Sequence, residues 1–110
     1  MSSPIHSLNP IVLNAVDLTS SHTSNILEIG EVGGYAVQSI FTGSPIGTLE
    51  VKGSNTLNLS DFITVDTYAV TSDGKRMLNV ERAHYSYIIV VYTKTSGTGN
   101  LTCIVSAKEI

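Results

Sequence analysis

The clearest strand signal in this sequence reads Gly34-Tyr35-Ala36-Val37-Gln38-Ser39-Ile40-Phe41. Tyr35, Val37 and Phe41 fall on one face of an extended chain, because successive side chains of a strand point to opposite sides. A short distance further on, Thr48-Leu49-Glu50-Val51-Lys52 alternates apolar and polar residues in the same way. The two stretches predict strands of a half-buried sheet.

The rest of the chain repeats this pattern of short apolar runs separated by turn residues. β-Branched residues are frequent, and charged residues make up only 14% of the chain, which favours strands over surface helices. No segment keeps a 3.6-residue apolar period over ten or more residues, so we expect little or no helix. The other predicted strands are Ile11–Leu18, Ser24–Glu28, Phe62–Val70, Met77–Val80, Tyr85–Tyr92 and Leu101–Ala107.

Glycine and proline mark the predicted connections. Thr42–Gly47 has the composition of a loop, and Ser72–Lys75 contains an Asp-Gly pair typical of hairpin turns. Ser96–Asn100 is predicted to close a final hairpin between the last two strands. About eight short strands at near-even spacing predict an all-β fold, a two-sheet antiparallel sandwich or jelly roll.

The length of 110 residues fits one domain. Pro4 and Pro10 cannot donate a backbone hydrogen bond to a neighbouring strand, so residues 1–10 are predicted to form an extended N-terminal arm. A frayed terminus is the alternative. Residues 11–110 are predicted to form a single β-sandwich domain.

Composition also limits the partners. The net charge is −3, and the six lysines and arginines are dispersed, which argues against nucleic-acid binding. The longest apolar run, Ile88–Val91, is too short to cross a membrane, and no targeting segment is visible, so we expect synthesis in a cytoplasm. Cys103 is the single cysteine and lies in an apolar run, which predicts a buried, unreactive thiol.

No spacing in the sequence indicates an active site. His6, His22 and His84 are isolated, with no His-x-x-x-His or Cys-x-x-Cys pair for a metal. The glycine-rich piece Ser96–Gly99 lacks the lysine of a phosphate-binding loop, and no Gly-x-Ser-x-Gly motif is present. We therefore expect a protein that is not an enzyme and uses no cofactor and no metal.

Two stretches resemble a family of small β-sandwich proteins from tailed bacteriophages. One is Gly34–Leu49, with its Gly-Tyr-x-x-Gln strand and Thr-Gly-Ser-Pro-x-Gly-Thr-Leu continuation. The other is Tyr87–Leu101, in which a Tyr-x-x-x-x-Tyr-Thr strand leads into Ser-Gly-Thr-Gly-x-Leu. Size and ending are most similar to the capsid decoration, or "staple", proteins of epsilon15-like podoviruses. Many members carry tryptophans in the regions that read Asn55–Asn58 and Met77–Val80 here, and this chain has none.

The resemblance implies a virion structural protein, dimeric, bound to the outer surface of the capsid through the major capsid protein. It supplies no catalytic residues. A tail or fibre module that recognises a host receptor such as a carbohydrate is the alternative, because it would share the fold.

Two apolar segments are the predicted contact surfaces. Ile5, Leu8 and Ile11 lie in or next to the arm, where they can attach it to a neighbour. The strand Tyr85–Tyr92 is apolar on both faces, which indicates a central strand covered twice. One cover is the core, and the second can be a partner or an ordinary part of the same fold. The predicted partner contacts on this strand are Ile88, Val90 and Tyr92.

Overall fold

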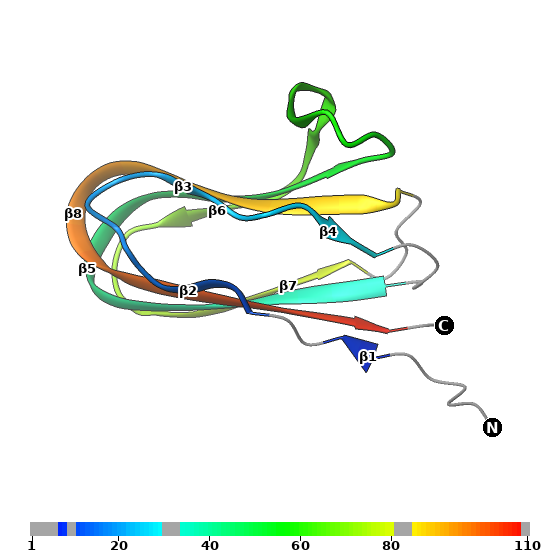
Figure 1. Ribbon diagram of the computed structural model, residues 1–110. Helices are drawn as coiled ribbons and strands as arrows, with labels where there is room; N and C mark the ends of the chain where they lie inside the picture. The colour runs from blue at the N-terminus through cyan, green and yellow to red at the C-terminus, as the bar shows by residue number, and fades with distance from the viewer. Residues whose placement is uncertain (1–6, 9–10, 30–33, 81–84, 109–110) are drawn as a thin grey trace.

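Two long strands, paired along their whole length, form the centre of the molecule. The computed structural model describes residues 7–8, 11–29, 34–80 and 85–108. Strand β5 (Gly34–Ser54) pairs antiparallel with β8 (Tyr87–Lys108), from Gly34 opposite Lys108 to Ser54 opposite Tyr87. Figure 1 shows both strands folding back at the same end, so that one sheet becomes two layers. The predicted all-β antiparallel fold is confirmed, and its two layers are halves of one hydrogen-bonded sheet.

The shorter strands extend both layers sideways. On one side, β6 (Ile63–Val70) pairs with residues 47–53 of β5, and β7 (Gly74–Val80) pairs with residues 35–41. On the other side, four strands pair with β8 in antiparallel fashion. They are β1 (Ser7–Leu8), β2 (Ile11–Asp17), β3 (His22–Thr23) and β4 (Leu27–Glu28). A short 3-10 helix, η1 (Leu59–Asp61), lies between β5 and β6.

The two stretches predicted as a loop and as a hairpin turn are instead the bends of the long strands. Thr42–Ile46 of β5 pairs with Ser96–Asn100 of β8, including Gly43 opposite Gly99 and Pro45 opposite Gly97. The prediction of a hairpin between Tyr85–Tyr92 and Leu101–Ala107 is therefore wrong, because residues 87–92 and 101–107 belong to the same strand, β8. The two motifs that carry the phage resemblance meet at this bend.

The hairpin expected at Asp73-Gly74 is also wrong. Strands β6 and β7 do not pair with each other; both pair with β5, at different ends of it. The connection between them carries the chain from one layer to the other. Gly74 adopts φ 137°, which is consistent with the positive φ that the Asp-Gly pair predicts.

The core lies between the layers. Tyr35, Val37 and Phe41 are buried, as the alternation predicted. Leu49 and Val51 are also fully buried. The long strands thus each contribute an inward row to both layers. In β5 the alternation continues through the bend, whereas in β8 an extra residue, Thr95, shifts the inward positions from even to odd numbers. Other fully buried large side chains are Leu18, Ile29, Pro45, Val70, Ile88, Val90, Tyr92, Leu101 and Val105.

Glycine at the bend is required by close approach of the two backbones. A Cβ built on Gly99 would lie 1.9 Å from the carbonyl oxygen of Thr42, and one on Gly97 would lie 2.1 Å from that of Ser44. Both glycines adopt positive φ, 150° and 83°. Any side chain here would have to separate strands that the fold keeps paired.

We predict that Gly99→Ala destabilises the protein by about 3 kcal/mol, because overpacking adds to backbone strain. Gly74→Ala is the matched control, since φ there is 137° but a Cβ would meet nothing within 4 Å. Strain alone should cost this control about 1–2 kcal/mol. Urea denaturation measures both, and equal losses would contradict the steric role of the bend.

Two core tyrosines differ in how their hydroxyls are satisfied. The hydroxyl of Tyr35 lies 2.7 Å from that of Tyr85. The hydroxyl of Tyr92 is buried and has no hydrogen-bond partner among the described residues. A buried hydroxyl without a hydrogen-bond partner lowers the free energy of unfolding, whereas a hydrogen-bonded one raises it.

We therefore predict different effects on stability when tyrosine is replaced by phenylalanine at these two positions. Tyr92→Phe should leave the free energy of unfolding unchanged or raise it by about 1 kcal/mol, and Tyr35→Phe should lower it by about 1 kcal/mol. Thermal unfolding at neutral pH measures the pair. A clear loss of stability in Tyr92→Phe would show that its hydroxyl has a partner.

Candidate interaction surfaces

Three of the predicted contact residues lie in the core. Ile88, Val90 and Tyr92 of β8 are 1%, 1% and 0% exposed. Their predicted role as a partner contact is corrected, because side chains enclosed between the layers offer no surface. Ile89, on the opposite face of the strand, is also buried at 4% exposure, so the expectation of a strand covered on both faces holds for this part of β8.

The predicted arm contacts have different positions. Ile5 lies outside the described residues, as does most of the predicted arm 1–10. Leu8 belongs to β1, whose backbone pairs with residues 107–108 of β8. Ile11 begins β2 opposite Ile104 and is 55% exposed. Of the predicted contact residues, Ile11 is the one whose described side chain is available to a partner.

Ile11 stands at the border of an uncharged sheet face. A cross-strand row runs from Ile11 to Ile104 of β8, Gln38 of β5 and Met77 of β7. Paired residues on neighbouring strands share a face, so these side chains all point outward from the layer that contains β7. Two residues along β7 from Met77, Lys75 is opposite Ile40 and points to the same side, so the surface without charges is limited. We call this row, together with the neighbouring outward residues Ala36, Asn79 and Ser106, the uncharged face.

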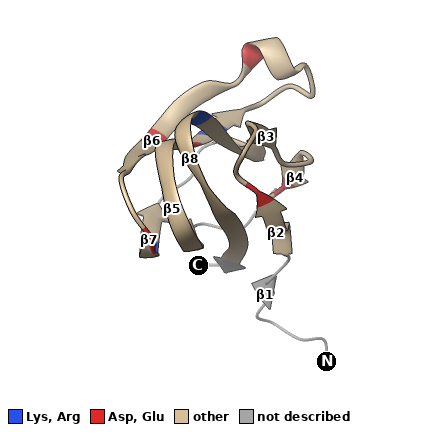
Figure 2. Ribbon diagram, turned by 90° about the vertical axis from the view of Figure 1, so that its left-hand side faces the viewer, with Lys and Arg blue, Asp and Glu red and all other residues tan. Residues whose placement is uncertain are grey.

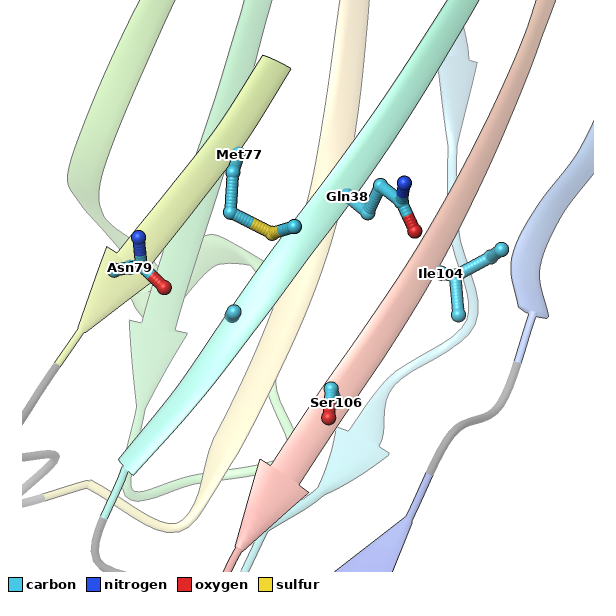
Figure 3. A pocket seen from close by; sticks show the side chains of 6 residues that line it. Gln38, Met77, Asn79, Ile104 and Ser106 are labelled. Atoms are coloured by element: carbon cyan, nitrogen blue, oxygen red, sulfur yellow. The ribbon is translucent and has the colours of Figure 1, made fainter. Parts of the chain in front are cut away.

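The uncharged face contains a hollow. The hollow has a volume of about 430 Å³, and none of its lining residues is charged (Figure 3). Gln38 and Asn79 supply amide donors and acceptors, and Met77, half exposed, supplies an adaptable apolar side chain. Such a surface suits contact with another uncharged protein surface. The lining residues are Ala36, Gln38, Met77, Asn79, Ile104 and Ser106.

The sequence contains a signal for this face, although the residues that carry it are absent from the predicted contact surfaces. Ala36 and Gln38 are the outward positions of the stretch that decided the fold, between the inward Tyr35 and Val37. The alternation therefore placed them outside. Their register with β7 could not be foreseen, because it depends on the pairing of strands about forty residues apart in sequence.

Reactive and metal-binding groups are not assembled in the described part of the chain. No group of three or more His, Cys, Asp or Glu residues that could hold a metal occurs there. Figure 2 shows acidic and basic residues dispersed over the elements. No helix among the described residues is long and apolar enough to cross a membrane.

Cys103 is fully buried, as predicted, with its Sγ 3.5 Å from the Ser39 hydroxyl. Burial raises the pKa of the thiol to about 11, although the contact with Ser39 acts in the opposite direction. Because the thiolate is the reactive form, the folded protein keeps this cysteine unreactive at neutral pH.

We predict that a thiol reagent such as 5,5′-dithiobis(2-nitrobenzoate) does not label Cys103 in the native protein at pH 8, and labels it fully in denaturant. The thiol is protonated below its raised pKa and enclosed by the core. Absorbance at 412 nm follows the reaction. Rapid labelling without denaturant would show that the layers open around β8.

Comparisons with known proteins concern the fold. No family model matches the chain, and no curated protein matches it in sequence. Among solved structures, it is similar to the SPBc2 prophage-derived protein YomS, with TM-score 0.60, 13% identity and coverage of 96% of this chain and 97% of that one. The PBSX exported protein XepA matches with TM-score 0.65 and 16% identity over 91% of this chain and 36% of that one.

The K1 cleaved adhesin domain of Lys-gingipain from Porphyromonas gingivalis W83 is also similar, with TM-score 0.58 and 13% identity, over 82% of this chain and 63% of that one. At such identities the likeness demonstrates a shared fold. Because this fold occurs in proteins of different kinds, function has to be inferred from the surfaces of this chain.

Proposed function

We propose that this protein is a non-enzymatic virion protein that binds the outer surface of a phage capsid and stabilises the head. The observation that carries the proposal is the uncharged face, which continues to the exposed Ile11. Two further points support it. The motifs at the bend resemble those of phage β-sandwich proteins, and the similar structures include a prophage-derived protein, YomS.

The partner in this proposal is the major capsid protein. A decoration protein binds many equivalent copies of one site, so each contact can be modest while the shell as a whole gains stability. A face without charges fits this use, because little desolvation of charge opposes binding. The resemblance adds that the protein binds as a homodimer.

The copy number per particle tests the proposal directly. Purified virions are analysed by quantitative gel densitometry against the major capsid protein. One copy per capsid subunit, or a simple fraction of that number, is the expected result. A handful of copies per particle would favour the alternative of a tail or fibre module that recognises a host receptor, and absence from the particle would refute a virion role.

We predict that Met77→Lys weakens binding of the purified protein to heads that lack it by about tenfold or more, because a buried, unpaired charge would face the partner. Thr67→Lys, at an exposed position of β6, introduces the same charge away from the uncharged face and is the control. Cosedimentation with heads measures both variants. Equal binding of Met77→Lys and wild type would show that the uncharged face is not part of the contact with the capsid.

A further inference from the structure

The connection between β5 and β6 carries a second exposed apolar surface. Leu57, Leu59 and Ile63 are 63%, 56% and 72% exposed, and Val65 next to them is 39% exposed. We call residues 55–63 the apolar loop. Figure 1 shows this segment, in green, projecting beyond the two layers. Exposed apolar side chains gathered on one projection commonly mark a binding site.

The loop is held by its own hydrogen bonds. The hydroxyl of Thr56 donates to Asp61 Oδ2 at 2.9 Å, across the loop. Asn58 caps η1, its Oδ1 accepting from the backbone N–H of Ser60 at 3.1 Å and from the Ser60 hydroxyl at 2.9 Å. Phe62, only 9% exposed, anchors the end of the loop. The leucines are thus presented by an ordered backbone, which lowers the entropy lost on binding.

The charges near the loop indicate the chemistry of its partner. Asp61 is the one charged residue in the sequence of the loop, and Lys52, opposite Thr64 of β6, is the nearest lysine or arginine along the sequence. Segments that lie on anionic membranes usually carry lysine or arginine beside their apolar residues. An acidic loop with apolar tips is instead complementary to an apolar pocket bordered by basic residues on a protein surface.

We infer that the apolar loop is a second docking site, which inserts Leu57 and Leu59 into an apolar pocket with a basic rim on a neighbouring protein of the particle. The inference rests on the proposed virion function and adds a contact to it. The loop rises on the side of the layer that contains β6, whereas the uncharged face lies outside the layer that contains β7 (Figure 1). The two sites therefore engage different surfaces, and the protein bridges them.

The test compares binding to heads that lack the protein. Leu57→Ser/Leu59→Ser removes both tips, and Ile46→Ser, at a 42% exposed position of the bend, is the matched control. We expect about tenfold or greater weakening for the double variant and less than about twofold for the control. Because these side chains are exposed, the thermal midpoints should stay close to that of the wild type.

A second variant tests the basic rim. Asp61→Asn keeps an oxygen for the Thr56 hydroxyl and removes the charge. We expect binding to heads about two- to fivefold weaker at low ionic strength, with the difference vanishing at high salt. Unchanged binding of Asp61→Asn at low salt would contradict the inference that the partner's pocket has a basic rim.

The outcomes separate the two proposals. If the wild type binds heads and the double variant binds equally well, the loop inference is overturned and the capsid role stands. If the wild type binds no heads, the capsid role fails and the loop inference with it. Two parallel assays use neutral phosphatidylcholine vesicles and sedimentation velocity. A loop-dependent signal in either would overturn the inference in favour of a bilayer or of a second copy of this chain.

Discussion

Across the fold of the sheet, β5 and β8 stay paired residue by residue, from Thr42 opposite Asn100 to Ile46 opposite Ser96. Gly43, Gly97 and Gly99 make this possible, because each adopts positive φ and has no Cβ to separate the strands. Every other strand is placed by this pair: β6 and β7 line one side of β5, and β1 to β4 line β8. The core then closes because both long strands contribute inward rows to both layers.

The open side between β6 and β7 is closed by side chains instead of hydrogen bonds. The Arg76 guanidinium lies 5.0 Å from the centre of the Tyr68 ring, and the Tyr68 and Phe41 ring centres are 6.2 Å apart. On β6, the Asp66 carboxylate accepts the backbone N–H of Thr67 at 2.8 Å. This contact occupies one donor that an unpaired strand would otherwise offer to another chain. One donor of the β6 edge is thus occupied, whereas the uncharged face and the apolar loop remain accessible.

The proposed binding role depends on these two surfaces. Its buried thiol is held protonated, and the described acidic and histidine side chains are not gathered into a metal site. The same architecture occurs in a prophage-derived protein and in an adhesin domain, at identities of 13% each. A framework fixed by backbone pairing tolerates such divergence, because its outward positions are free to change.

The amino-acid sequence by itself determined the antiparallel all-β class and the inward positions of β5. Period-two alternation makes Tyr35, Val37 and Phe41 inward wherever the strand pairs. It did not determine that Thr42–Ile46 and Ser96–Asn100 pair. Glycine-rich stretches have the same composition whether they form a turn between two strands or a bend within one strand.

Only the tertiary structure decided which face of β8 points between the two layers. A strand that is apolar on both faces carries no signal for the choice, and the position of the second layer turned Ile88, Val90 and Tyr92 inward. The tertiary structure also assembled the uncharged face. Its members come from separate strands, and their adjacency depends on a register set by long-range pairing.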